Sequence, residues 1–193
     1  MEKPFDRSEL LLGADALERL RRAKVVIFGI GGVGGYAAEA LVRSGIGRLV
    51  MVDHDRVSLT NLNRQIIALH STLGRYKVDV MRERALDINP EAEIEARRCF
   101  FLPENEREFD FSDCDYVVDA VDTVTAKLAI IEKAKREGVP VISAMGAYDA
   151  SGYYYESAKE TPYNDMVQEY QILQYNNLID TDHTVNSFFY LKE

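Results

Sequence analysis

The residues of this chain that could do chemistry follow the first two predicted strands of a sheet. A glycine-rich turn comes after the apolar run at residues 24–29, and a polar segment comes after a second apolar run at residues 48–53. Arginine, lysine and amide side chains can neutralise and orient phosphoryl oxygens, and a guanidinium is a planar, permanently charged fork. The candidate nucleotide-binding residues are Gly29, Gly31, Gly32, Gly34, Asp53, Asn61, Arg64 and Lys77.

The glycine-rich turn, Gly29-Ile-Gly-Gly-Val-Gly34, has a spacing typical of nucleotide-binding turns. Gly29 permits the tight turn, Gly31 lets the backbone approach a phosphate, and Gly34 lets the helix and the strand pack closely. The helix that follows offers free N–H groups and the positive end of its dipole. The turn therefore predicts a bound nucleotide, without saying which one.

The polar side chains after the second strand favour ATP over a redox dinucleotide. Asp53 ends that strand, where a carboxylate can accept hydrogen bonds from ribose hydroxyls or cap the next turn. Asn61 and Arg64 have no task in an NAD enzyme, whereas a triphosphate carries negative charge that they can neutralise. Lys77 begins a predicted helix, where its charge opposes the helix dipole. Either a nearby anion or an exposed position would explain that lysine.

Two carboxylates lie at the end of the fourth predicted strand. Ligands of open α/β sheets bind at this carboxyl edge, and Mg²⁺ takes one or two carboxylates together with phosphate oxygens and waters. Asp122 lies just beyond the strand and is the candidate metal ligand. Asp119 could instead cap the following turn.

The composition is that of a folded, acidic protein. The 193 residues are 47% hydrophobic and carry a formal net charge of −9, which fits a domain with a real core. This charge argues against non-specific nucleic-acid binding by the whole surface. No apolar run is long enough to span a membrane and the N-terminus has no signal-peptide pattern, so we expect a cytoplasmic protein. Cys99 and Cys114 have no metal-ligand spacing and are expected to be buried.

Strand and helix patterns alternate along the chain. This order predicts an α/β fold with a doubly wound, mostly parallel sheet and right-handed crossovers. The patterns predict strands at residues 24–29, 48–53, 93–101, 115–121 and 140–145, and helices at residues 10–20, 32–44, 77–88 and 125–137.

The composition changes near residue 148. We expect an ATP-binding domain over residues 1–150, followed by an acidic, tyrosine-rich segment of unassigned role over residues 151–193. Within that segment, residues 166–178 have a weak helix pattern and residues 187–191 a weak strand pattern.

These motifs together resemble the ThiF/MoeB family, the prokaryotic relatives of ubiquitin-activating enzymes. The resemblance covers about residues 5–147 and is carried by the glycine turn, Asp53-x-Asp55, residues 58–65, Lys77, Ile88-Asn-Pro90 and Asp119-Ala-Val-Asp122. Within the family, residues 7–13, 44–47, 60–68 and 143–147 are similar to the tRNA threonylcarbamoyladenosine dehydratase branch.

The resemblance implies a Rossmann-like adenylation fold and an ATP-dependent enzyme that activates a carboxylate. In this branch the acid is the threonyl carboxylate of N6-threonylcarbamoyladenosine in tRNA, and ring closure with loss of AMP gives the dehydrated product. Arg7 matches an arginine that relatives insert into the ATP site of the partner subunit, which implies a homodimer. A sulfur-relay protein is a further candidate partner.

The resemblance also implies roles for single residues. The glycines would lie at the phosphates and Asp53 on the ribose, while Asn61, Arg64 and Lys77 would surround the triphosphate. Asp122 would hold Mg²⁺. The catalytic residues would be Arg64, Lys77 and, from the partner subunit, Arg7.

Cysteine usage separates the branches of the family. Relatives that transfer ubiquitin-like proteins use a cysteine beyond the fifth strand, and many sulfur-carrier activators hold zinc through Cys-x-x-Cys pairs. No cysteine follows Cys114 here, which favours the dehydratase branch.

Three alternatives stay open. The first is an adenylyltransferase that activates the C-terminal carboxylate of a small sulfur-carrier protein. The second is a nucleotide-binding remnant without catalysis, since the chain departs from the family after residue 147. The third is an NAD-dependent oxidoreductase, which leaves Asn61, Arg64 and Lys77 unexplained.

Overall fold

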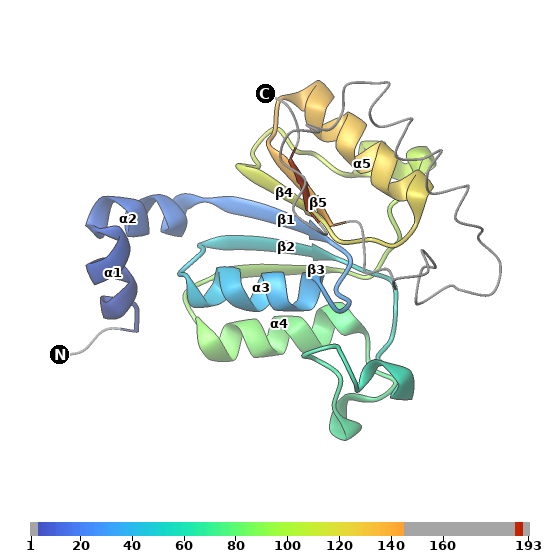
Figure 1. Cartoon of the computed structure of the whole chain (residues 1–193), viewed down its shortest axis with the longest axis horizontal. Helices are drawn as coiled ribbons and strands as arrows, with labels where there is room; N and C mark the ends of the chain where they lie inside the picture. The colour runs from blue at the N-terminus through green and yellow to red at the C-terminus, as the bar shows by residue number, and fades with distance from the viewer. Residues whose placement is uncertain (1–3, 145–187, 191–193) are drawn as a thin grey trace.

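The computed structural model describes residues 4–144 and 188–190, which build one six-stranded sheet (Figure 1). The strand order is β3-β2-β1-β4-β5-β6. Strands β1 to β5 are parallel and β6 is antiparallel to β5, which confirms the expected doubly wound, mostly parallel sheet. The strands are β1 (Lys24–Phe28), β2 (Arg48–Val52), β3 (Glu93–Arg97), β4 (Tyr116–Asp119), β5 (Val141–Ala144) and β6 (Phe188–Tyr190).

The central strands are apolar on both faces because helices cover both faces. Helices α3 and α4 pack on one face of the sheet and α5 packs on the other (Figure 1). Two further helices, α1 and α2, project beyond the amino ends of the strands. The helices are α1 (Asp6–Leu12), α2 (Ala14–Arg22), α3 (Gly34–Arg43), α4 (Lys77–Ile88) and α5 (Val124–Glu137).

The strand register brings three strand ends to one edge of the sheet. Phe28, the last residue of β1, is paired with Val52 on one side and with Asp119 on the other. The residues that follow β1, β2 and β4 therefore start from neighbouring positions at this carboxyl edge.

A cluster of phenylalanines fills the core on the α5 face. Phe28 is fully buried, and its ring centroid lies 5.0 Å from that of Phe101, 5.5 Å from Phe109 and 5.8 Å from Phe111. The last three come from the connection between β3 and β4, which these contacts fold back against the sheet. Aromatic burial of this extent is among the larger contributions to the stability of a domain.

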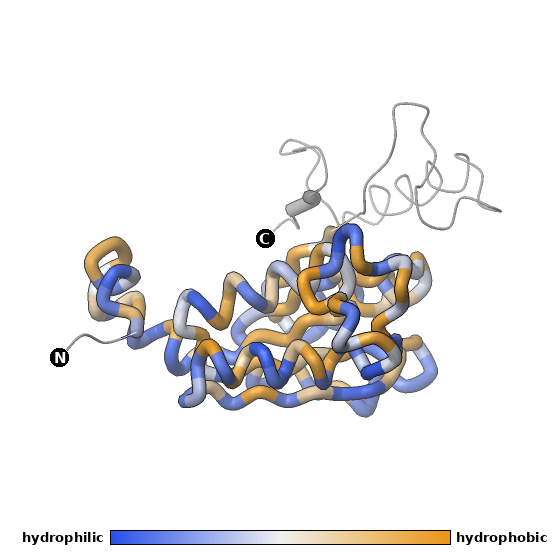
Figure 2. The backbone as a smooth tube through the Cα atoms, turned by 90° about the horizontal axis from the view of Figure 1, so that it is seen from below, coloured by the Kyte–Doolittle hydropathy of each residue, from blue (hydrophilic) through white to orange (hydrophobic). Residues whose placement is uncertain are grey.

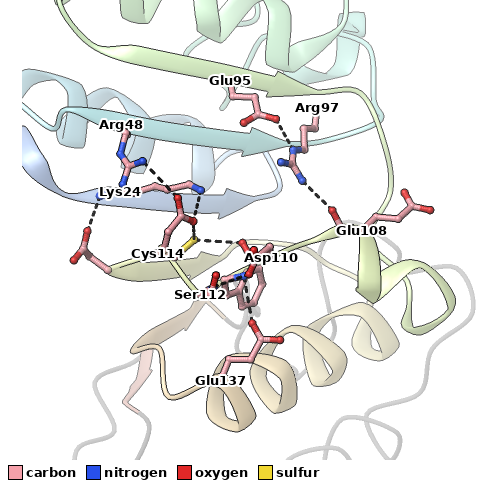
Figure 3. Close-up of polar contacts among 12 residues, drawn as sticks. Lys24, Arg48, Glu95, Arg97, Glu108, Asp110, Ser112, Cys114 and Glu137 are labelled. Atoms are coloured by element: carbon pink, nitrogen blue, oxygen red, sulfur yellow. Dashed lines mark hydrogen bonds and ion pairs between the residues drawn. The ribbon is translucent and has the colours of Figure 1, made fainter.

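Ion pairs close the amino edge of the sheet (Figure 3). Lys24 Nζ lies 2.5 Å from Asp113 Oδ1, and Arg48 Nη1 lies 3.4 Å from Asp113 Oδ2. The backbone N–H of Phe111 donates to Glu137 Oε2 at 3.2 Å, which ties the same loop to the end of α5. These contacts provide partners for Lys24, Arg48 and Asp113 at the amino edge, which lies opposite the glycine turn.

The structure differs from the expected helix over residues 10–20. Two helices, α1 and α2, occupy this region and meet at Gly13, whose backbone has φ 84° and ψ 157°. That combination is open almost only to glycine and breaks the helix. Figure 2 shows a hydrophobic stretch at the far end of this helix pair, away from the sheet.

The strands end earlier than the sequence pattern predicts. The third strand ends at Arg97, because the chain leaves the sheet to bury Phe101 beside Phe28. The fourth ends at Asp119, whose Oδ1 accepts the backbone N–H of Val121 and turns the chain. β6 agrees with the expected strand over residues 187–191, whereas the expected helix over residues 166–178 and the domain boundary at residue 150 lie outside the described residues.

The described residues contain no helix that is long and apolar enough to cross a membrane. The two cysteines are free and half-buried, so the expectation that both are buried was too strong.

Substituting Phe28→Ala should destabilise the fold by about 3–5 kcal/mol, because it leaves a cavity among three rings. Urea unfolding followed by circular dichroism measures this change. The matched control is Leu59→Ala, whose side chain is exposed and which should change stability by less than about 0.5 kcal/mol. Equal effects of the two substitutions would contradict the assignment of Phe28 to the core.

Candidate functional site

The glycine turn is built by two close backbone contacts that exclude any side chain. Gly29 has φ 86°, and a Cβ there would lie 2.5 Å from the carbonyl oxygen of Ala120. A Cβ on Gly34 would lie 1.8 Å from the carbonyl oxygen of Gly29. Gly29 is therefore required by the packing of the glycine turn against the turn after β4, and Gly34 by the packing of the start of α3 against Gly29.

Gly31 and Gly32 have room for a side-chain atom, whereas Gly29 and Gly34 do not. The nearest atoms to a Cβ at these two positions lie 3.7 Å away and belong to Gln65 Nε2 and to Arg64 Cγ. Directly beyond them, α3 begins at Gly34, and no side chain caps its N-terminus. A free helix N-terminus behind an open stretch of backbone is the arrangement that accepts phosphate groups.

Asp53 holds the end of β2 against the glycine turn. Its Oδ2 accepts the backbone N–H of Ile30 at 2.6 Å, and its Oδ1 accepts that of Asp55 at 2.7 Å. The capping role that the sequence left open is therefore present. Each carboxylate oxygen can accept a second hydrogen bond, so the ribose role stays a prediction.

Lys77 is buried and already has a counter-ion. Its ammonium lies 2.7 Å from Asp55 Oδ2, and its side chain is 7% exposed. The exposed-lysine alternative is thus wrong. The anion implied by its place at the start of α4 is a carboxylate of the protein itself, one that the sequence pattern did not assign. Whether Lys77 also meets a phosphate stays a prediction.

The polar segment after β2 packs against the glycine turn. Asn61 is buried, and its Oδ1 accepts the backbone N–H of Ser58 at 2.9 Å, so this amide shapes the segment from within. Arg64 is half-buried and donates from Nη1 to the carbonyl oxygen of Thr60 at 2.9 Å. The aliphatic part of the Arg64 side chain lies beside Gly32, and its expected contact with a phosphate stays a prediction.

Gln65 is a residue of this site that the sequence reasoning did not assign. Its side chain is buried and its Oε1 has no hydrogen-bond partner, while its Nε2 faces Gly31. Buried amide oxygens in folded proteins are almost always satisfied, so this one points to a missing hydrogen-bond donor. Its place directly after Arg64 in the polar segment was the available signal.

The two aspartates after β4 have different surroundings. Asp119 is fully buried within hydrogen bonds of the protein, which supports the capping role and not a metal role. Asp122 is exposed, and its Oδ1 accepts the hydroxyl of Thr123 at 3.4 Å. A single exposed carboxylate fits Mg²⁺ that takes its other ligands from phosphate and water.

The other group of potential metal ligands in the described ranges is already engaged. Asp53, His54 and Asp55 have ligand atoms within 4.8 Å of one another. Asp53 accepts two backbone N–H groups and Asp55 pairs with Lys77, so this cluster is a less suitable metal site than Asp122.

Arg7 lies apart from the other candidates. It is exposed on α1, which projects from the amino end of the sheet, whereas the glycine turn follows the carboxyl end of β1 (Figure 1). The chain does not bring its own Arg7 to its own glycine turn.

Neither cysteine has the low thiol pKa of a nucleophile. Burial raises the pKa of the Cys99 thiol and that of the Cys114 thiol. Both therefore stay protonated near neutral pH, where a thiolate would be the reactive form.

Comparison with known proteins agrees with this geometry. The sequence matches the ThiF family over residues 5–183. It is 47% identical to the tRNA threonylcarbamoyladenosine dehydratase of Bacillus subtilis strain 168 over 143 residues, which is 74% of this chain and 56% of that protein. The Escherichia coli K12 protein of the same name is 41% identical over 74% of this chain and 53% of its own length.

A solved structure shares the fold. The crystal structure of the E. coli tRNA N6-threonylcarbamoyladenosine dehydratase in complex with ATP superposes with a TM-score of 0.76 and 34% identity, over 93% of this chain and 76% of that chain. This chain spans about half the length of the curated relatives that it matches.

Two glycine substitutions should separate packing from ligand binding. Gly34→Ala should destabilise the fold by at least about 3 kcal/mol, because its methyl group meets the backbone of Gly29. Gly32→Ala should leave stability within about 1 kcal/mol but weaken ATP binding about tenfold, because its methyl group occupies the space where a phosphate would lie. Urea unfolding and calorimetry measure the two quantities. Unchanged ATP affinity in Gly32→Ala would contradict the assignment of this surface to phosphate.

Proposed function

Because the chain belongs to the ThiF family, we propose that it binds ATP·Mg²⁺ and adenylates the threonyl carboxylate of N6-threonylcarbamoyladenosine in tRNA. Cyclising dehydration of the same nucleoside would follow. The substrate class is that of the dehydratases that the chain resembles, and the residues at the carboxyl edge of the sheet are those that would bind ATP.

The observation that carries the proposal is the open surface over Gly31 and Gly32. It is bordered by Arg64, by the Nε2 group of Gln65 and by the uncapped start of α3. All three favour a group rich in negatively charged oxygens, since the N–H groups of a side-chain amide, a guanidinium and a helix N-terminus can donate to phosphate. An NAD enzyme would have no need of Arg64 at this position.

The chain supplies charge and orientation, and no protein nucleophile is required. Asp53 would orient the ribose, while Arg64 and Lys77 would offset the negative charge that grows on the phosphates during attack. Bound Mg²⁺ would offset further charge on the phosphate oxygens, with Asp122 as its protein ligand. A carboxylate oxygen of the substrate attacks the α-phosphorus, and pyrophosphate leaves.

Ring closure needs little from the protein. The acyl-adenylate is an activated acid, so a nucleophilic atom of the same nucleoside can attack the acyl carbon and release AMP. Holding both groups in one geometry makes the step effectively unimolecular.

Activation of a sulfur-carrier protein is the second candidate, and the cysteines disfavour it. The 193 residues contain no Cys-x-x-Cys pair, and both thiols are held protonated by burial. Neither thiol is therefore suited to take up sulfur for such a carrier protein.

The purified chain should catalyse ATP–pyrophosphate exchange that requires tRNA carrying the threonylcarbamoyl nucleoside. Mass spectrometry of the nucleosides should then show the loss of one water. Arg64→Ala should lower the exchange rate at least about a hundredfold, because it removes a charge that stabilises the phosphates in the transition state. Circular dichroism checks that the variant folds. Exchange that depends on a Gly-Gly-ended carrier protein instead would support the second candidate, and ATP binding without any exchange would indicate a remnant.

We infer that two copies of the chain pair through the N-terminal helices. Leu10 is 88% exposed and Leu11 is 83% exposed on α1, the helix that also carries Arg7. Adjacent leucines in water are unfavourable unless a partner covers them. A two-fold pair would also explain an arginine that its own site does not use.

Complementation between two variants tests this pairing. Arg7→Ala and Arg64→Ala should each be inactive, and an equimolar mixture should regain about a quarter of the wild-type exchange rate. The reason is that half of the dimers in the mixture contain one copy of each variant, and each of these dimers has one intact site out of two. The separate variants are the controls, and a mixture without activity would contradict the shared site.

A further inference from the structure

Three side chains form a buried polar network where β4 and β5 end. Asp119 is 0% exposed, Ser143 2% and Lys127 4%. Asp119 and Ser143 are register partners on β4 and β5, and Lys127 lies on α5 above them. The sequence pattern left Asp119 ambiguous and assigned no role to the other two.

All three hydrogens of the Lys127 ammonium have an acceptor. They point to Asp119 Oδ2 at 2.7 Å, to the carbonyl oxygen of Ala144 at 2.9 Å and to Ser143 Oγ at 3.3 Å. Ser143 in turn donates from Oγ to Asp119 Oδ2 at 2.5 Å. The network is closed, so it offers no free group to a ligand.

Stability alone does not account for such a network. Desolvation of two charges offsets most of their attraction, and apolar side chains of similar volume often serve a core as well or better. Buried charges that are fully hydrogen-bonded do fix geometry, because each bond is short and directional. A positioning task is therefore the better explanation.

The element that the network positions is the turn between β4 and α5. Asp119 Oδ1 accepts the backbone N–H of Val121 at 3.1 Å, and the Ala120 N–H donates to the Phe28 carbonyl oxygen at 2.8 Å. Lys127, one turn into α5, anchors the other side of this loop to the same carboxylate. Between the two anchors lies Asp122, whose Oδ1 accepts a long hydrogen bond from the Thr123 hydroxyl at 3.4 Å.

We propose that Lys127, Asp119 and Ser143 are positioning residues that fix the turn carrying Asp122, which packs against Gly29, so that the Asp122 carboxylate meets Mg²⁺ on the nucleotide. The inference rests on the proposed function. The network should change how much Mg²⁺ strengthens ATP binding. It should not change the affinity for ATP without Mg²⁺, which depends on the glycine turn.

The test measures the ratio of ATP affinities with Mg²⁺ and with EDTA by calorimetry. Ser143→Ala removes one bond to Asp119 but keeps the ion pair, and it should lower this ratio about tenfold, the effect of one hydrogen bond to a charged group. In an Asp122→Asn background, adding Ser143→Ala should change the ratio no further, because residues that act through one another are not additive.

A second variant tests the network without leaving an unpaired buried charge that could unfold the protein. Lys127→Met alone leaves the Asp119 charge buried without a partner, whereas Lys127→Met with Asp119→Asn removes both charges. The neutral pair should fold and should also show the lowered ratio.

The matched control is Lys133→Met on the same helix. Lys133 is equally buried, and its ammonium lies 2.6 Å from Glu137 Oε1, away from the β4 edge. This substitution should lower stability without changing the ratio. An unchanged ratio in Ser143→Ala and in the neutral pair would overturn the inference and leave the proposed function standing. A wild-type chain that does not bind ATP at all would overturn both.

Discussion

The close approach of two backbone segments at the carboxyl edge is the constraint on which the rest of the structure depends. The turn after β1 lies so near the turn after β4 that Gly29 has no room for a side chain, and the start of α3 lies so near the carbonyl group of Gly29 that Gly34 has none either. These contacts set where α3 begins and which N–H groups it presents. They also hold the glycine turn against the turn that carries Asp122. The proposed triphosphate site is thus a consequence of how the central strands end.

Local signals in the sequence predicted the parts of the fold that local chemistry determines. The strand patterns located all five parallel strands, although the third ends at Arg97 and not at residue 101, and the glycine spacing located the turn. Helix α4 begins at Lys77 and ends at Ile88, as its pattern and the following Asn89-Pro90 indicate. Gly13 shows the limit, because apolar spacing continued across it while its backbone could not stay helical.

The rest depends on contacts between distant segments, which no local pattern contains. Asp55 reaches Lys77 because a bridge between Arg56 and Tyr76 joins the loop after β2 to the start of α4. Lys127 resembles an ordinary surface lysine of a helix until the register of β4 and β5 places Asp119 and Ser143 beneath it. Gln65 could be recognised only when its burial and its missing partner were visible together.

The pairing of Lys77 with Asp55 has a consequence for the empty protein. Asp55 is half exposed, so its carboxylate can turn to water when a stronger anion arrives. Until then the Asp55 carboxylate is a counter-ion that holds the Lys77 ammonium in place without a ligand. Nucleotide entry would then be an exchange of one anion for another, and the site would not need to reorganise its charge when it loads or empties.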